Sequence, residues 1–327
     1  MDEQQEIIQS IIGVNNIAIV MHDNPDSDAI GSAIALENAL KQMNKQVTII
    51  TQNKIKKKYL DVFGKNRVNK INIPNDFFDI LFVLDCSEEC RINLDIRDYS
   101  NKIIVIDHHN GFEPYGDIYW CEDVIANSML IYKLIKMMMD VGLNVILNSK
   151  IATALYMGIR SDSFNFRNPN VTPETHEICS ELLKYSADTE YINELERYSR
   201  GILKLETFAF SSLLYDEHYK IIYTIITKDM IDETHSTFED ASQIIDALKL
   251  IKNVDVALLF ISAKGKIYIK ARSTKYNVSK VMKQFGGGGH KLAAGAVCFS
   301  NSSYSLMNSV VKAMRLEIEN KKVGKKK

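Results

Sequence analysis

The sequence has few cysteines, almost no net charge and no long apolar run, and each shortage excludes a class of protein. Its five cysteines are scattered over 327 residues and odd in number, which argues against a disulfide framework and for a reducing compartment. No window approaches the roughly 18 consecutive apolar residues of a membrane span. The acidic first residues, MDEQQEIIQS, do not resemble a secretory signal. We therefore expect a cytoplasmic protein without a membrane partner.

The balance of charge bears on nucleic-acid binding. With 40 basic and 41 acidic residues, the formal net charge is −1, whereas proteins that bind nucleic-acid duplexes carry a clear basic excess. A few local cations can still bind a short phosphate ligand, but affinity for long nucleic acid requires many phosphate contacts. We therefore expect a short phosphate-bearing ligand and no long nucleic acid.

The pattern of apolar residues predicts an α/β protein of two domains. In the first half, apolar β-rich runs alternate with helical patterns, which indicates a doubly wound parallel sheet. The runs lie at 16–22, 47–51, 79–85 and 102–107, and the helical patterns at 29–43, 128–141, 148–160 and 173–184. The second half mixes strands and helices and predicts a smaller α/β domain. We place the first domain at 1–185, a mostly helical linker at 186–205 and the second domain at 206–327.

Acidic and histidine side chains follow three of the predicted strands. Because the carboxyl ends of parallel strands form one edge of a sheet, we expect these side chains to meet there, together with one from the end of a helix. They are His22, Asp26, Asp28, Asp85, Asp107, His108, His109 and Asp162. Such a cluster is strongly repulsive without cations. Carboxylates with imidazoles suit Mn²⁺, with Mg²⁺ or Co²⁺ possible. For Asp28 alone, capping of the following helix is an equally good explanation.

A glycine run stands out in the second half, where residues 285–297 read FGGGGHKLAAGAV. Glycines allow the backbone to approach a ligand closely and to turn several amides toward one anion. The run consists of Gly286, Gly287, Gly288 and Gly289, and His290 adds a donor beside it. Taken alone, a flexible linker explains such a run as well.

Together these motifs resemble the DHH phosphoesterase superfamily with a DHH-associated C-terminal domain. HDNPDSDAIGS, LDCS, DHH and SDS occur in the order found in that family, and GGGGH…AAG resembles the signature of the associated domain. The resemblance extends from about residue 15 to 300 and is closest to the two-domain nanoRNase/pAp phosphatases. There are three departures: Ser27 and Phe164 stand where relatives often carry glycine, and Ser87-Glu88 stands where Gly-Asp is common.

The resemblance implies roles for individual residues. One metal ion would be held by His22, Asp26 and Asp85, and a second by Asp28, Asp85, His108 and Asp162. Asp85 would bridge two Mn²⁺ ions, His109 would contact the phosphate and protonate the departing oxygen, and Asp107 would orient a ligand imidazole. Substrate contacts would come from His109 and, across a cleft between the domains, from the second domain. Those are Arg272, Ser273, Gly286, Gly287, Gly288, Gly289 and His290.

The resemblance also implies an activity. The implied activity is that of a manganese-dependent phosphodiesterase, which would degrade very short oligoribonucleotides to mononucleotides and dephosphorylate adenosine 3′,5′-bisphosphate (pAp) to AMP. Cyclic di-AMP or its linear product pApA is the alternative substrate, and a homodimer is left open. A nucleotide-binding regulator with a decayed centre is the alternative from another class, and the intact set of candidate ligands speaks against it.

Overall fold

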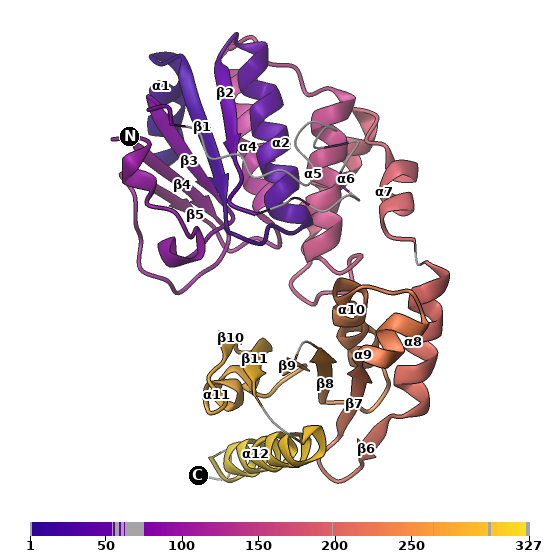
Figure 1. Cartoon of the computed structure of the whole chain (residues 1–327). Helices are drawn as coiled ribbons and strands as arrows, with labels where there is room; N and C mark the ends of the chain where they lie inside the picture. Colours follow the sequence, from indigo (N-terminus) through magenta and orange to yellow (C-terminus); the bar gives the residue numbers. More distant parts are fainter. Residues whose placement is uncertain are drawn as a thin grey trace. The chain divides into compact units, whose positions relative to one another are not determined.

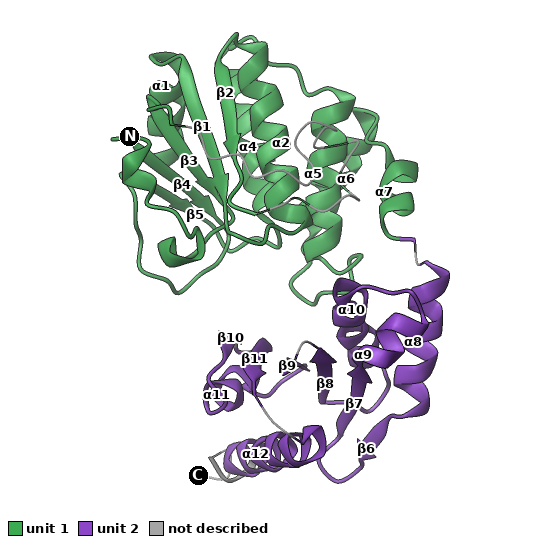
Figure 2. Ribbon diagram, in the orientation of Figure 1, with its two compact units in different colours: residues 1–196 green, residues 197–327 purple. Residues whose placement is uncertain are grey.

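The computed structural model describes residues 2–53, 55, 59, 62, 75–197, 199–263, 265–299 and 302–324 (Figure 1). The chain divides into two compact units, Met1–Glu196 and Arg197–Lys327 (Figure 2). The segment 186–205, expected as a linker, contains helix α7 (Thr189–Leu195) and the first residues of α8 (Arg200–Ser211). In the described part of the chain, no helix has the length and apolarity needed to cross a membrane.

The first unit is built on a five-stranded parallel sheet with the order β2-β1-β3-β4-β5. Its strands are β1 (Asn16–Met21), β2 (Gln46–Ile50), β3 (Ile80–Leu84), β4 (Ile103–Asp107) and β5 (Ile118–Cys121). The first four coincide with the predicted apolar runs. β5 has no such run, because its residues IYWC alternate between buried and half-buried positions.

Both faces of this sheet are buried, by different kinds of structure. On one face, side chains such as Ile19, Phe82 and Ile104 pack against helices in one large core. The helices of this unit are α1 (Glu3–Ile12), α2 (Ser27–Gln42), α4 (Asn127–Asp140), α5 (Ser149–Asp162), α6 (Pro173–Lys184) and α7. On the other face, Val83 and Val105 pack under loops and the 3₁₀ turns η2 (Glu89–Arg91) and η3 (Ile96–Asp98).

Two glycines allow α2 and α5 to approach closely. A Cβ on Gly31 would overlap the backbone carbonyl of Ala154, and one on Gly158 would overlap the Ser128 hydroxyl and lie 2.6 Å from Asp28 Oδ1. Close contact between these helices brings the start of α2 beside the end of α5. Both of those helix ends carry candidate ligands.

The second unit has a six-stranded mixed sheet with the order β10-β11-β9-β8-β7-β6, in which only β7 and β8 are parallel. The strands are β6 (Leu214–Asp216), β7 (Ile221–Thr227), β8 (Val256–Ala263), β9 (Lys266–Ser273), β10 (Gly288–His290) and β11 (Ala293–Cys298). One face packs against α8, α9 (Lys228–Glu233) and α10 (Phe238–Lys249), and the other against α11 (Val278–Lys283) and α12 (Ser303–Gly324). The predicted fold class, a parallel-sheet domain followed by a smaller α/β domain, is confirmed. The described helices of the first unit pack on one face of its sheet, so the expected doubly wound arrangement is not seen among the described residues.

Candidate metal centre

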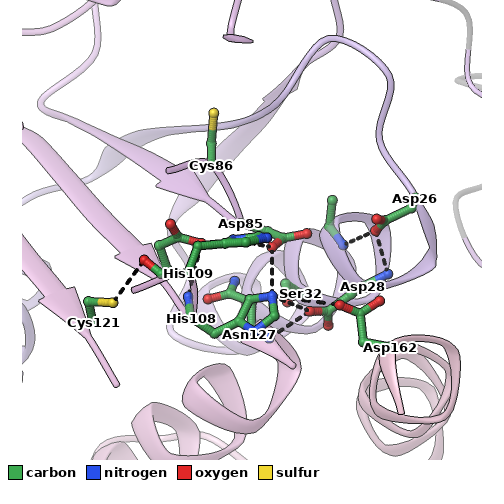
Figure 3. A network of polar contacts seen from close by, with 12 residues as sticks. Asp26, Asp28, Ser32, Asp85, Cys86, His108, His109, Cys121, Asn127 and Asp162 are labelled. Carbon is green, nitrogen blue, oxygen red and sulfur yellow. Dashed lines mark hydrogen bonds and ion pairs between the residues drawn. The ribbon is translucent and has the colours of Figure 1, made fainter. Parts of the chain in front are cut away.

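The eight acidic and histidine residues singled out in the first half all lie in the first unit, at the carboxyl ends of its central strands. His22 follows β1, Asp85 follows β3, and Asp107 ends β4. Asp26 precedes α2 and Asp162 is the last residue of α5. Figure 3 shows Asp28, Asp85, His108 and Asp162 turned toward one another. The structure therefore brings together side chains that are up to 140 positions apart in the sequence (22 to 162).

Their potential ligand atoms form three overlapping groups. Within each group all the atoms lie within 4.8 Å of one another. Asp85 belongs to two of the groups, and so does His108. The groups are His22, Asp26 and Asp85; Asp28, His108 and Asp162; and Asp85, His108 and His109. The first two groups correspond to the two ligand sets that the family resemblance implies. The implied second set also includes Asp85, which the second group does not contain.

Asp26 and Asp28 have different local roles. The Asp26 side chain is the N-cap of α2, because its Oδ1 accepts hydrogen bonds from the backbone amides of Asp28 (3.0 Å) and Ala29 (3.1 Å). Asp28 lies in the first turn of α2, but its side chain bonds the start of α4. It accepts hydrogen bonds from the Asn127 amide (2.6 Å), the Ser128 amide (2.9 Å) and the Ser128 hydroxyl (2.5 Å). The alternative that Asp28 caps its own helix is therefore wrong.

Asn127 and Ser128 were not among the residues predicted from the sequence, although both are fully buried beside the cluster. Their backbone amides are free to bond Asp28 because they open α4, whose N-cap residue, Ala126, provides no side-chain hydrogen bond. The helical pattern at 128–141 located the start of this helix to within one residue. Nothing local indicated that a carboxylate about 100 positions away would cap it.

The two histidines are held in different ways. His108 Nδ1 lies 3.1 Å from the Val124 carbonyl oxygen, which fixes the ring so that Nε2 faces the cluster. That nitrogen lies 3.3 Å from Asp85 Oδ1, 3.6 Å from Asp162 Oδ2 and 4.0 Å from Asp28 Oδ2. His109 Nδ1 lies 2.8 Å from Asp107 Oδ1. Asp107 thus orients the ring of His109, and a backbone carbonyl orients the ring of His108.

The electrostatics of the cluster favour added positive charge. Burial, followed by the charges of Asp26 and Asp28, raises the pKa of Asp85 well above its usual range. Burial and neighbouring carboxylates also raise the pKa of Asp162 and of Asp28. At His108 burial lowers the pKa, but Asp28 and Asp162 outweigh it and the pKa rises. The carboxylates thus tend to retain protons in a site where a cation could replace them.

The residues present fit a divalent cation. Asp85 Oδ1 and His108 Nε2 are buried atoms without a hydrogen-bond partner among the described residues, and such atoms are costly to bury unless something binds them. Asp85 also has a backbone φ of 56°, a conformation that costs about 1–3 kcal/mol and is concentrated at functional sites. Carboxylate oxygens with imidazole nitrogens are the donors of Mn²⁺ and Mg²⁺ sites rather than of thiolate zinc sites.

The turn after α5 accounts for one departure from the family pattern. Phe164, Asn165 and Phe166 have φ values of 57°, 55° and 63°, in the left-handed region that favours glycine. A glycine at the first of these positions would adopt this conformation without a steric penalty. In this chain the turn is maintained with a phenylalanine next to the Asp162-Ser163 pair.

The candidate substrate residues of the second half all lie in the second unit. Arg272 is three-quarters buried, and its Nε donates to Asp246 Oδ1 at 3.2 Å, so α10 orients its guanidinium. Ser273 does not fit the expected role. It is 2% exposed, and its hydroxyl donates to the Asp255 carbonyl and accepts from the Lys275 and Tyr276 amides. Its hydroxyl closes a turn, and we no longer propose it as a substrate contact.

The second half of the glycine run, Gly288 and Gly289, is part of the sheet, so the run is not a flexible linker. β10 pairs with β11, and His290 is its last residue. A Cβ on Gly287 would overlap the backbone of β11, one on Gly289 would lie 2.7 Å from the Ala293 carbonyl oxygen, and Gly286 has a φ of 73°. A Cβ on Gly288 would meet nothing within 4 Å. Packing and backbone conformation within this unit therefore require three of the four glycines, and Gly288 is the exception.

Comparison with known proteins agrees with this architecture. A relative from Bacillus subtilis (strain 168), the bifunctional oligoribonuclease and PAP phosphatase NrnA, is 27% identical over 90% of this chain and 93% of its own length. The protein of the same name from Thermus thermophilus is 25% identical over 96% and 93%. The solved structure of an exopolyphosphatase-related protein from Bacteroides fragilis shares the fold, with a TM-score of 0.84 at 22% identity over 99% and 98% of the two chains.

Two family models match consecutive parts of the chain. The model of the DHH family N-terminal domain matches residues 16–159, and that of the DHHA1 domain matches residues 218–319. The first span contains the candidate ligands apart from Asp162, and the second contains the glycine run. The chain therefore carries a DHH-family N-terminal domain followed by a DHHA1 domain.

Proposed function

We propose that the protein is a manganese-dependent phosphodiesterase that shortens oligoribonucleotides of a few residues to mononucleotides and removes the 3′-phosphate of pAp. The observation that carries the proposal is the buried cluster in which Asp85 Oδ1 and His108 Nε2 lie 3.3 Å apart and accept or donate no hydrogen bond among the described residues. Relatives named for both activities match this chain over nine-tenths of its length. That agreement supports the choice of substrates.

In this proposal, His22, Asp26 and Asp85 hold one divalent cation, and Asp28, His108 and Asp162 hold the other with Asp85 shared between them. Two such cations would supply positive charge that orients a phosphoryl group, offsets its developing charge and acidifies water. Asp28 keeps its place through three hydrogen bonds from the start of α4. His108 keeps its Nε2 directed at the cluster through the Val124 carbonyl.

His109 has the role of proton donor in this proposal. Asp107 accepts from Nδ1, so a protonated His109 offers its Nε2–H to the departing oxygen of the phosphoester. The imidazole is 23% exposed on its side chain, compared with 11% for His108. The greater exposure suits a group that meets substrate rather than one that is enclosed among ligands.

The test is a substrate panel with purified full-length protein in Mn²⁺ and in Mg²⁺. The panel contains ribonucleotides of two to five residues, a long single-stranded RNA, pAp, pApA and cyclic di-AMP. The proposal expects rapid loss of the short ribonucleotides and pAp with Mn²⁺ and slow loss of the long RNA. Equal rates on long and short RNA would contradict it, and faster turnover of pApA or cyclic di-AMP would replace the substrate assignment.

Two aspartates at opposite ends of β3 provide a matched pair of variants. Asp85→Asn removes the negative charge and one of the two oxygens of the proposed shared ligand, and should abolish turnover. Asp79→Asn makes the same chemical change before the strand, where the exposed side chain accepts from the backbone amides of Asn15 and Asn16. It should leave the activity per folded molecule unchanged. Retained activity in Asp85→Asn would remove this residue from the centre.

A further inference from the structure

A second polar site lies in the second unit, which contains none of the residues of the metal centre. It is a pocket of about 280 Å³, close to the lower end of the roughly 300–1,000 Å³ of small-molecule sites. Its lining residues are Asn277, Ser279, Lys280, Lys283 and Lys291. Asn277 is the N-cap of α11, the next three lie in α11, and Lys291 directly follows β10. Helix α11 and strand β10 pack against one another (Figure 1).

The pocket carries an excess of positive charge. Lys280 forms an ion pair with Glu317 of α12 at 3.1 Å. Neither Lys283 nor Lys291 forms an ion pair within the part of the chain that the structure describes. One carboxylate therefore offsets one of three ammonium groups, which leaves an excess of two positive charges around the pocket.

Lys291 adds a cation from a segment outside the helix. Lys280 and Lys283 lie in the last turn of α11, where the helix carbonyls favour cations in any case. Lys291 follows β10, and the Val278 amide of α11 donates to its carbonyl at 2.9 Å. That bond fixes a third lysine beside the helix. Like charges from two segments repel one another unless an anion lies between them.

Neutral donors complete the lining. The Asn277 side-chain oxygen accepts from the Lys280 amide at 3.1 Å, so the amide nitrogen of Asn277 remains as a donor. Ser279 is 7% exposed and adds a hydroxyl. Ammonium, amide and hydroxyl donors around a small volume suit a compact anion with several oxygens. A phosphomonoester carries three acceptor oxygens and a charge of about −1.5 to −2 at pH 7, which matches the excess of two.

We propose that this pocket binds the terminal phosphomonoester of a nucleotide ligand, a phosphate other than the one hydrolysed at the metal centre. That the ligand is a nucleotide rests on the proposed function. The presence of an anion site rests on the lysines alone. Inorganic phosphate offers the same chemistry, and the experiment separates the two sources.

The test measures binding in chelator, so that no substrate is turned over. A labelled trinucleotide with a 5′-phosphate and the same trinucleotide with a 5′-hydroxyl are titrated with full-length protein and followed by fluorescence anisotropy. The pocket variant is Lys283→Gln/Lys291→Gln. The control is Lys204→Gln/Lys312→Gln, which makes the same change of charge at exposed positions outside the pocket.

Wild type and control should bind the 5′-phosphorylated probe more tightly than the hydroxyl probe, and the pocket variant should lose that preference. The expected weakening is about tenfold or more for charge-assisted hydrogen bonds. The salt dependence of binding should become shallower by about 0.7 for each phosphate that the variant no longer neutralises. Millimolar inorganic phosphate should abolish the preference in wild type only if the pocket accepts the free ion as well.

An unchanged preference in the pocket variant would overturn the proposal, as would an equal loss in the control. Hydrolysis is measured on the same preparations with Mn²⁺. Preference for the 5′-phosphate without hydrolysis of any oligonucleotide would keep the pocket and reject the proposed function. Hydrolysis of oligonucleotides by a wild type that shows no preference for the 5′-phosphate would reject the pocket and keep the proposed function.

Discussion

The hydroxyl of Ser128 provides the sharpest test of how the metal centre is organised. It donates to Asp28 Oδ1 at 2.5 Å from the first turn of α4, and Asp28 is fully buried. Ser128→Ala removes this hydrogen bond and leaves the amides of Asn127 and Ser128 still bonded to the carboxylate. The substitution removes a single oxygen, so the shape of the site changes little.

The magnitude follows from the number and type of hydrogen bonds. One of the three bonds that hold the Asp28 carboxylate is removed, and a hydrogen bond to a charged group contributes about 1.5–3 kcal/mol. A loss of about 2 kcal/mol from the ionised form that binds the cation corresponds to roughly thirtyfold weaker binding. This value lies within the 10- to 100-fold range typical of residues that support metal ligands.

The assay is the affinity of chelator-treated protein for Mn²⁺, measured as free Mn²⁺ by electron paramagnetic resonance, with urea unfolding alongside. The control is Ser100→Ala. That serine is equally buried, and its hydroxyl bonds both polar backbone atoms of Lys102 before β4, at the edge of the sheet remote from the cluster. It should lower the free energy of unfolding by about 1 kcal/mol without changing Mn²⁺ binding. Wild-type affinity in Ser128→Ala, or an equal loss in Ser100→Ala, would refute the reasoning.

Three further predictions concern charge and packing. Because burial raises the pKa of Asp85, the metal-free folded state holds a proton that the unfolded state releases above about pH 4, so it loses stability as the pH rises. The increase in Tm on adding Mn²⁺ should therefore grow from about pH 5 to 8, and a constant increase would contradict this. Gly158→Ala places a methyl group on the Ser128 hydroxyl and should weaken Mn²⁺ binding and cost about 1–3 kcal/mol of stability. Gly13→Ala, with open space around its Cβ, should do neither, and equal urea midpoints for the two would contradict the packing argument. Gly287→Ala should lower Tm because its Cβ overlaps β11. Gly288→Ala, whose Cβ meets nothing within 4 Å, should keep the wild-type Tm and weaken binding of a 5′-phosphorylated trinucleotide. Wild-type affinity in Gly288→Ala would remove this glycine from the proposed substrate contacts.

Elements with strong local patterns were predictable. The runs that became β1, β3 and β4 are almost continuously apolar and rich in Ile, Val and Leu, and each was located to within a residue or two. Elements whose residues are small or alternate in polarity were missed. β11 reads AAGAVC and β10 has three residues, two of them glycine, so neither shows the β-branched enrichment on which strand prediction depends.

The candidate site divides in a similar way. The sequence could place an acidic or histidine residue after each central strand, because strand ends are marked by the end of an apolar run. It could not show that Ser273 is enclosed in a turn or that Asp246 holds Arg272. Those contacts involve segments that are paired by folding and share no periodic pattern.

The sequence by itself determined which side chains could bind a cation and the edge of the sheet on which they gather, because both follow from residue type and from strands running in parallel. Only the tertiary structure decided how each one is held. Asp28 is fixed by the start of α4, His108 by the carbonyl of Val124, and His109 by Asp107. These orientations depend on helices and loops meeting over the sheet, most of them far apart in the chain, and no local pattern in the sequence records such contacts.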